Sequence, residues 1–208
     1  MSAWAGRRVV LGVSGGIACY KSCALARRLV EAGAAVDVVL TRGAAEFVRP
    51  LTFAALTGRP VFESLWAPGA ALSHVRLGQE ADLVIVAPAT AHLIARMAQG
   101  LADDLLTTLL LAATAPVLIA PAMNDEMYAH PQTRTNLERL RSRGVAIVGP
   151  EIGALAEGPS ERPGRRSEPE TILAHAVRAL RGRGRLSGRR VVVTAGPTRE
   201  SIDPVRVV

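Results

Sequence analysis

The sequence predicts an α/β protein with a doubly wound, open parallel sheet, flavodoxin- or Rossmann-like, in three layers. Short apolar runs alternate along the chain with segments of helical periodicity, which is the pattern of βαβ units. The run at 81–87 (ADLVIVA) is apolar almost throughout, as in a strand that helices cover on both faces. A chain of 208 residues, 49% of them hydrophobic, is long enough to bury the core of such a domain.

The expected elements alternate in type along the chain. The first half contains a strand at 8–13, a helix at 17–32, a strand at 36–40 and broken helices at 43–57. Gly33 ends the first helix, and Pro50 interrupts the helical stretch after the second strand. The second half contains strands at 81–87, 116–120 and 145–148, and helices at 91–98, 103–113 and 131–143. Right-handed crossovers between the strands would place a ligand beyond their carboxyl ends.

The character of the chain changes after Gly149. Residues 150–167 have no periodic pattern and are rich in Gly, Pro, Ser and charge, which predicts a loop before a helix at 168–180. We therefore expect a first domain at 1–180, a linker at 181–188 and, at 189–208, the truncated start of a second domain that opens with a strand.

The net charge of +7 does not indicate a nucleic-acid-binding protein. Residues 161–208 carry 11 basic and five acidic side chains, so that +6 of this charge lies near the end of the chain. Aromatic residues, on which bases would stack, make up only 3% of the sequence. No apolar stretch is long enough to cross a bilayer, and no signal peptide is recognisable. We expect a cytoplasmic protein with neither a membrane nor a nucleic-acid partner.

The two cysteines, Cys19 and Cys23, lie four residues apart on the first predicted helix. Two thiols cannot bind a metal ion unaided, and a reducing cytosol disfavours a disulfide. We expect both to pack as small residues, and we expect no metal site.

A glycine-rich turn, Ser14-Gly15-Gly16-Ile17, leads from the first predicted strand into the first helix. Glycines there let backbone N–H groups approach a phosphate, and the helix N-terminus favours its negative charge. The spacing matches neither the GxGxxG dinucleotide motif nor a P-loop, so the phosphate of a mononucleotide fits better than a pyrophosphate. A tight turn that binds no ligand would have the same sequence.

Two further turns follow the central strand and the next strand along the chain. The first is 88–92 (PATAH), whose small residues would let a flat ring approach the backbone, although Thr90 could equally cap the next helix. The second is 121–124 (PAMN), in which the Asn124 amide could orient a carboxylate or cap the following turn. His74 precedes the central strand, but a lone histidine is more often structural than catalytic.

These segments together resemble the homo-oligomeric flavin-containing cysteine decarboxylases, which include the decarboxylase half of the bifunctional coenzyme A biosynthesis flavoproteins. The likeness extends over residues 7–180. It rests on segments in the family's order and spacing: 12–21 (GVSGGIACYK), 46–60 (EFVRPLTFAALTGRP), 81–91 (ADLVIVAPATA), 103–107 (DDLLT) and 121–127 (PAMNDEM). The tail at 186–206 resembles the opening of the phosphopantothenate–cysteine ligase domain that follows in those proteins.

The resemblance implies that residues 1–180 bind FMN and names the residues that do so. The phosphate would lie near Ser14, Gly15, Gly16, Ile17 and Thr41, and the ring against Ala89, Thr90, Ala91, His92, Ala122 and Met123. His74 matches the family's active-site histidine and Asn124 its substrate-carboxylate contact. Met127 and Ala156 would also contact the substrate. The turns after three strands would thus converge to hold the flavin ring beside His74.

The implied reaction is the FMN-dependent decarboxylation of 4'-phosphopantothenoylcysteine to 4'-phosphopantetheine in coenzyme A biosynthesis. In the family, the flavin takes hydride from the carbon that bears sulfur, and the resulting thioaldehyde accepts the electrons released as CO₂ leaves. The same flavin then reduces the ene-thiol. The resemblance also implies a homo-oligomer, a trimer or a dodecamer, with FMN at subunit contacts.

The chain departs from the family at the substrate clamp, which usually follows the pattern GxxACGxxGxGRM. Glu157 stands where a proton-donating cysteine is expected, and Glu161 and Arg166 also differ. Gln79 replaces a residue that is often basic. Glu157 could donate the proton if burial on loop closure favoured its protonated form. Otherwise the enzyme would stop at the ene-thiol, or it would be degenerate.

Other classes of function stay open. A non-catalytic flavin-binding interaction protein of the same fold would need neither His74 nor Asn124. A prenyl-transferring flavoprotein or an oxidative peptidyl-cysteine decarboxylase would not carry the ligase-like tail. A NAD-dependent enzyme is disfavoured, because the second strand ends in Thr41 and not in an acidic residue.

Overall fold

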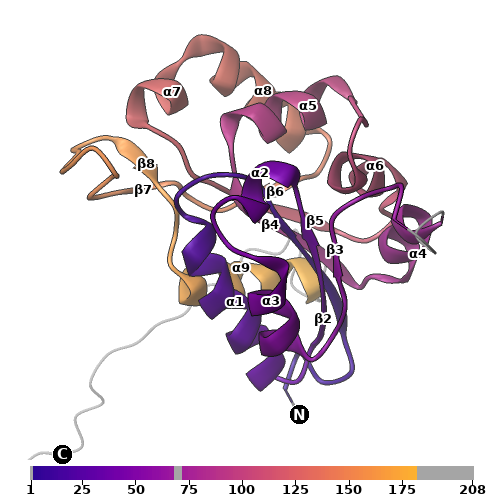
Figure 1. Ribbon diagram of the computed structural model, residues 1–208. Helices are drawn as coiled ribbons and strands as arrows, with labels where there is room; N and C mark the ends of the chain where they lie inside the picture. The colour runs from indigo at the N-terminus through magenta and orange to yellow at the C-terminus, as the bar shows by residue number, and fades with distance from the viewer. Residues whose placement is uncertain (1, 68–71, 182–208) are drawn as a thin grey trace, which may run out of the picture.

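The computed structural model describes residues 2–67 and 72–181 (Figure 1). Its six-stranded sheet has the order β3-β2-β1-β4-β5-β6, and every neighbouring pair in that sheet is parallel. The strands are β1 Arg8–Val13, β2 Ala35–Leu40, β3 Val61–Phe62, β4 Leu83–Ala89, β5 Val117–Pro121 and β6 Ala146–Ile147. This is the strand order of the Rossmann fold, in which a crevice opens between the first and fourth strands. The predicted fold class is confirmed.

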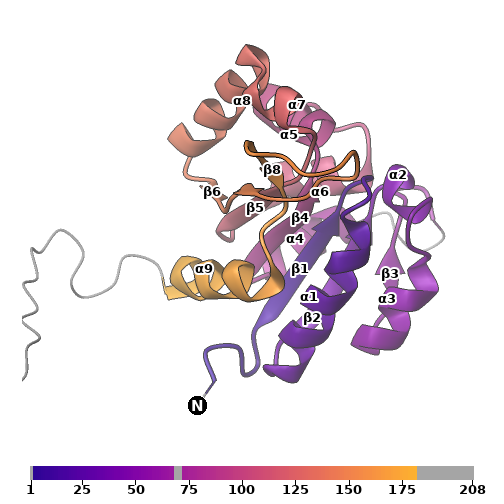
Figure 2. The ribbon, with the colours of Figure 1, turned by 90° about the vertical axis from the view of Figure 1, so that its left-hand side faces the viewer.

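Helices cover both faces of the sheet and make the three layers (Figure 2). Helices α1, α3 and α9 pack on one face, and α4, α5, α6 and α8 pack on the other. The helices are α1 Cys19–Glu31, α2 Arg42–Ala45, α3 Pro50–Thr57, α4 Ser73–Glu80, α5 Ala91–Gln99, α6 Leu105–Ala112, α7 Asp125–Ala129, α8 Pro131–Ser142 and α9 Pro169–Arg181. Among the described residues, none of these helices has the length and apolar character needed to cross a bilayer.

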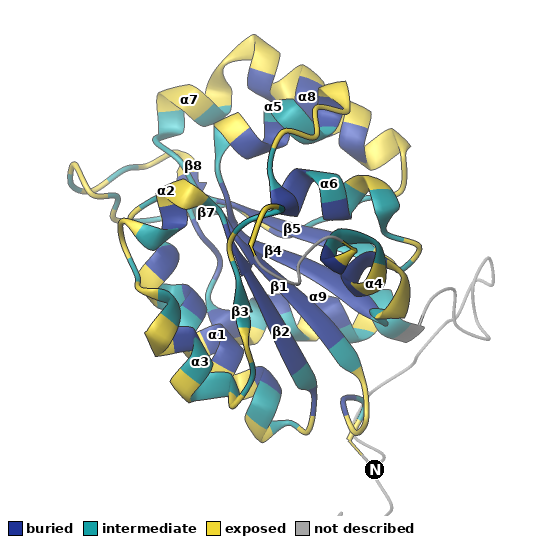
Figure 3. Ribbon diagram, turned by 45° about the vertical axis from the view of Figure 1, so that its right-hand side comes forward, coloured by how far each residue is buried: buried dark blue, intermediate teal, exposed yellow. Residues whose placement is uncertain are grey.

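The two central strands, β1 and β4, are buried on both faces (Figure 3). Their successive side chains alternate between two hydrophobic cores. In β1, Val9 and Leu11 belong to the core under α1 and α9, whereas Val10 belongs to the core under α5 and α6. In β4, Ile85 and Val86 are divided in the same way. Since neither face meets water, these strands need apolar side chains at every position. This explains the unbroken apolar runs in the sequence.

The structure also contains short elements that the sequence did not predict. Strand β3 has two residues and helix α7 has five, too few to show a hydrophobic period. The segment 150–167, predicted as a loop, contains an antiparallel pair, β7 (Glu151–Ile152) with β8 (Pro163–Arg165). The linker predicted at 181–188 starts at the last residue of α9. Its remainder, and the strand predicted at 189–194, lie outside the described residues.

The turn after β1 packs directly on the turn after β2. A Cβ atom on Gly15 would lie 2.5 Å from the carbonyl carbon of Gly43, closer than two non-bonded carbons can approach. The obstacle is backbone, which cannot rotate away as a side chain can. Gly15 therefore sets how closely these two turns approach at the carboxyl edge of the sheet.

We expect the substitution Gly15→Ala to lower the free energy of unfolding by about 2 kcal/mol, because the added methyl group forces two backbone segments apart. Gly16→Ala is the matched control, since its Cβ would have only Thr90 Cγ2 near it, at 3.4 Å. Urea unfolding of both variants measures the difference. Equal destabilisation by the two substitutions would contradict the close approach at Gly15.

Candidate functional site

The turns after β1 and β4 are joined by the buried hydroxyl of Ser14, which is 2% exposed. Ser14 Oγ donates to the Pro88 carbonyl at 2.8 Å and accepts the Thr90 N–H at 3.0 Å. The backbone N–H of Ser14 also donates to the Pro88 carbonyl, at 3.3 Å. The hydroxyl that the sequence suggested for phosphate binding is thus engaged in holding two turns together.

The turn after β5 is joined to the same group by backbone hydrogen bonds. The N–H of Ala122 donates to the Ala89 carbonyl at 3.1 Å, and the N–H of Met123 donates to the Gly164 carbonyl at 3.1 Å. The first bond links the turns after β4 and β5, and the second links the β5 turn to the β7–β8 hairpin. Three strand ends and a hairpin therefore form one continuous frame.

The N-terminus of α1 has no side-chain cap. Ala18 occupies the cap position, and the first turn of the helix carries no acidic residue. Helices α2 and α5 differ in this respect, because Thr41 and Thr90 cap them through side-chain oxygens. In α1 the N–H groups of Cys19 and Lys21 donate to the Gly16 and Ala18 carbonyls, at 2.9 and 3.2 Å. The partial positive charge of a helix N-terminus without a side-chain cap still favours an anion. Together with the glycine turn before it, α1 fits a phosphate group.

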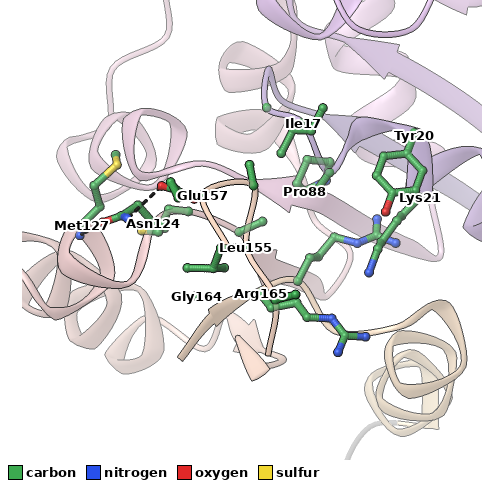
Figure 4. Close-up of a pocket in the computed structure, with 17 residues that line it drawn as sticks. Ile17, Tyr20, Lys21, Pro88, Asn124, Met127, Leu155, Glu157, Gly164 and Arg165 are labelled. Atoms are coloured by element: carbon green, nitrogen blue, oxygen red, sulfur yellow. Dashed lines mark hydrogen bonds between the residues drawn. The ribbon is translucent and has the colours of Figure 1, made fainter. Parts of the chain in front are cut away.

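A cavity of about 530 Å³ lies against this frame (Figure 4). Its wall comes from the start of α1, the turns after β4 and β5, and the β7–β8 hairpin. The lining residues are Gly16, Ile17, Ala18, Tyr20, Lys21, Pro88, Ala122, Met123, Asn124, Met127, Ala154, Leu155, Ala156, Glu157, Gly164, Arg165 and Arg166. A volume of this size is typical of a site for a small organic ligand.

The side chain of Asn124 caps a helix, as one interpretation of its position predicted, and its amide also contacts a carboxylate of the chain itself. Its Oδ1 caps α7 by accepting the N–H groups of Glu126 at 2.9 Å and Met127 at 3.4 Å. Its Nδ2 donates to Glu157 Oε1 at 2.9 Å (Figure 4). The cap fixes the orientation of the amide, so that its N–H₂ group points at a carboxylate.

The β7–β8 hairpin is docked on α7 as well as on the β5 turn. A Cβ atom on Gly164 would lie 2.7 Å from the Met123 carbonyl oxygen, so only glycine fits there. Ser160 Oγ donates to Asp125 Oδ2 at 2.5 Å, and this bond lowers the pKa of the Asp125 carboxyl. An exposed ion pair of Arg162 with Glu126 adds a second contact, at 2.5 Å. The hairpin thereby carries Glu157 to the cavity.

Eight of the 16 predicted site residues line this cavity. Those that line it are Gly16, Ile17, Ala122, Met123, Asn124, Met127, Ala156 and Glu157. Ser14, Gly15, Thr41 and Thr90 belong to the turns behind its wall. The side chain of Ala89 is wholly buried in the core, while Ala91 and His92 begin α5.

His74 is another predicted residue that does not line the cavity. It lies on α4, which packs with α6 on the sheet face opposite α1. Its buried Nδ1 has no hydrogen-bond partner among the described residues. We expected the three turns to hold the flavin ring beside His74. Within one chain the topology places α4 on the sheet face opposite α1, so this expectation stays a prediction.

Three cavity residues, Lys21, Arg165 and Arg166, were not assigned a role from the sequence. The sequence does single out Lys21, because it is the one lysine of the chain and follows the glycine turn. It also singles out Arg166, as a departure from the clamp pattern. Neither observation showed that the side chains gather at one cavity.

The fold and the cavity define a doubly wound α/β protein with a cavity of ligand size at the carboxyl ends of its strands. Residues 3–181 match the family described as Flavoprotein, and residues 186–208 match the DNA/pantothenate metabolism flavoprotein C-terminal domain. The chain belongs to the flavoprotein family, whose cofactor is a flavin. The resemblance found in the sequence is confirmed.

Individual relatives agree with the family. The chain is 52% identical over 210 residues to the coenzyme A biosynthesis bifunctional protein CoaBC of Vibrio cholerae, covering 100% of this chain and 52% of that protein. It is 50% identical over 206 residues to the Escherichia coli protein of the same name, covering 98% of this chain and 50% of that protein. The chain thus spans about half the length of these relatives.

Solved structures show the same fold. A PPC decarboxylase mutant complexed with pantothenoylaminoethenethiol is 30% identical, with a TM-score of 0.73 over 82% of this chain and 96% of that one. The FMN-dependent cysteine decarboxylase SpaF is 31% identical, with a TM-score of 0.70 over 83% of this chain and 96% of that one.

We expect neither Cys19 nor Cys23 to supply the thiol that the clamp lacks. Burial raises the pKa of both thiols, and Cys19 also donates to the Ser14 carbonyl at 3.1 Å. At pH 7 both should therefore react with a disulfide reagent more slowly than free cysteine, and fully once the chain is unfolded. Rapid modification of the folded protein would contradict this.

Proposed function

We propose that this protein decarboxylates 4'-phosphopantothenoylcysteine to 4'-phosphopantetheine, with FMN as its cofactor, in cytoplasmic coenzyme A biosynthesis. The observation that carries the proposal is the Asn124 amide, which already holds a carboxylate at the cavity wall. A substrate carboxylate could take the place of the Glu157 carboxylate on the same N–H₂ group. The names of the bifunctional relatives and of the PPC decarboxylase support this choice of substrate.

The residues around the first turn fit FMN better than a dinucleotide. The start of α1 has no side-chain cap, so its partial positive charge is available to one phosphate. The N–H groups of Cys19 and Lys21 are engaged within the chain, so the glycine turn would supply most of the N–H donors. We place the phosphate near Ser14, Gly15, Gly16, Ile17 and Thr41, and the ring toward the turns at 88–92 and 121–124. Bound FMN would supply the redox chemistry, taking up a hydride and later returning it.

The chain's own residues would bind, orient and protonate the substrate. Asn124 would hold the carboxylate, with its amide fixed by the cap of α7. The apolar side chains of Met123, Met127 and Leu155 line the same cavity and would limit water around the departing CO₂. Glu157, freed from Asn124 when the substrate carboxylate enters, would take up a proton from water and then act as the proton donor.

His74 would reach the reacting atoms from a second copy of the chain. Such a contact would join the start of α4 in one copy to the cavity of another, and large apolar side chains are exposed at both places. Trp66 (89% exposed) and Leu72 (72%) precede α4. Ile17 (61%) and Tyr20 (60%) line the cavity. Burial of these side chains between copies would be favourable. We propose a homo-oligomer, a trimer or a dodecamer built from trimers, in which α4 of one copy covers the cavity of another.

The match of residues 186–208 to the C-terminal domain family supports a domain boundary after α9. We propose an FMN-binding decarboxylase domain at 1–180, a linker at 181–188 and the start of a ligase domain from 189.

Mixed oligomers test whether His74 acts between copies. We expect His74→Ala and Asn124→Asp each to abolish turnover; Asn124→Asp keeps the oxygen that caps α7 but replaces the donor N–H₂. In co-expressed mixtures, random pairing leaves about one site in four with both residues intact, so about a quarter of the wild-type rate should return. No recovery in the mixture would mean that both residues act within one chain.

Turnover by FMN-loaded protein tests the proposed reaction and the role of Glu157. Wild type should release CO₂ from phosphopantothenoylcysteine, and its flavin should be oxidised at the end. Glu157→Gln should lower kcat by about 100-fold, because the proton donor is lost. Glu161→Gln, which alters a neighbouring glutamate that does not line the cavity, is the control.

The state of the flavin separates the remaining alternatives. Wild-type protein that releases CO₂ once and keeps its flavin reduced would be an oxidative decarboxylase that stops at the ene-thiol, an outcome that the absence of the usual cysteine at 157 specifically favours. Protein that binds FMN but releases no CO₂ would be the non-catalytic relative.

A further inference from the structure

The cavity has a cationic side that the proposed reaction does not use. Lys21 from α1 and Arg165 from β8 lie on one side of it, and Asn124 with Glu157 lies on the other (Figure 4). Arg166, the residue after β8, also lines this cationic side. One ligand that spans the cavity would therefore meet an amide at one end and three cations at the other.

A single carboxylate, that of Glu168, forms ion pairs with two of the three cations. Glu168 Oε1 lies 2.8 Å from Lys21 Nζ and is also hydrogen-bonded to Arg165. These two bonds lower the pKa of the Glu168 carboxyl, so that it is ionised at neutral pH. Glu151, which pairs with Arg165 across the β7–β8 hairpin, adds a second negative charge near Arg165. Two negative charges against three positive charges leave this side of the cavity with a net positive charge.

Arg166 has no ionic partner among the described residues, although it is only 2% exposed. Its Nη1 donates to Ser22 Oγ at 3.0 Å, and that hydroxyl in turn donates to the Ala87 carbonyl at 2.6 Å. Its Nε and Nη2 have no hydrogen-bond partner in the part of the chain that the structure covers. Burial lowers the pKa of Arg166 to about 10, so the guanidinium is still charged at pH 7. A buried charge without a counter-ion is unfavourable, and a ligand can provide that counter-ion.

We propose that Arg166, together with Lys21 and Arg165, binds the phosphate monoester of the substrate. The proposal rests on the proposed function and adds the group that selects a phosphorylated substrate. Two free guanidinium nitrogens suit the oxygens of a phosphate. Both nitrogens are covered in this structure, so the guanidinium must turn toward the cavity as the ligand enters.

The flavin phosphate is the other possible source of such a group, and Lys21, in the first turn of α1, is near the place proposed for it. That phosphate fits the N-terminus of α1, whereas Arg166 contacts the same helix at Ser22, about one turn further along. The clamp pattern has methionine where this chain has Arg166. The contribution of Arg166 to phosphate binding would therefore be a property of this chain.

Binding of the two forms of the product tests the proposal without turnover. Calorimetry on FMN-loaded protein would compare 4'-phosphopantetheine with pantetheine, for wild type, Arg166→Met and Arg134→Met. We expect wild type to bind the phosphorylated compound at least tenfold more tightly, roughly the effect of one charge-assisted contact, and Arg166→Met to lose most of this preference. Arg134→Met is the control, because Arg134 is exposed on α8 and does not line the cavity; it should keep the preference.

Other outcomes overturn the proposal in distinguishable ways. If Arg166→Met keeps the wild-type preference, Arg166 does not bind the substrate phosphate. If Arg166→Met instead weakens binding of FMN but not of riboflavin, the three cations bind the flavin phosphate and not the substrate phosphate. Turnover of phosphopantothenoylcysteine is measured on the same samples. A phosphate preference without CO₂ release would overturn the proposed function alone, and CO₂ release without the preference would overturn this inference alone.

Discussion

The buried hydroxyl of Ser14 is the interaction on which the rest of the site depends. It links the turns after β1 and β4, although 74 and 76 residues separate it from Pro88 and Thr90. In this strand order the crevice opens between these two strands, so the hydrogen bonds determine how the turns face each other across it. Helices α1 and α5 both begin at the joined turns. The hydrogen bonds between the turns therefore set the direction in which the N-terminus of α1 points.

Local patterns in the sequence predicted the sheet and its turns because both depend on neighbouring residues. The apolar runs of β1 and β4 follow from burial on two faces, and Ser14 and Asn124 stood out because each follows a strand. Contacts between distant residues leave no such pattern. Asn124 and Glu157 are 33 residues apart, and nothing near either one predicts that their side chains meet. Likewise, the face on which His74 lies follows from the packing of α4, and the burial of Arg166 follows from the fold of a hairpin.

The cavity is organised by charge as much as by shape. Its amide side holds a carboxylate supplied by the chain itself, and its cationic side has more positive than negative groups. Glu157 accepts a hydrogen bond from the Asn124 amide in this structure. A substrate carboxylate would displace it from that amide. A departure from the family pattern thus has a physical role, because the carboxylate keeps the amide paired until a ligand arrives. Arg166 is the corresponding departure at the other end.

All of this presupposes that the three joined turns hold a flavin. The most direct measurement is the absorption spectrum of the purified protein after incubation with FMN and removal of the free cofactor by gel filtration. We predict flavin bands that elute with the protein, at a ratio close to one FMN per chain. Colourless protein that cannot be loaded with FMN would contradict the flavin site, and with it the proposed reaction.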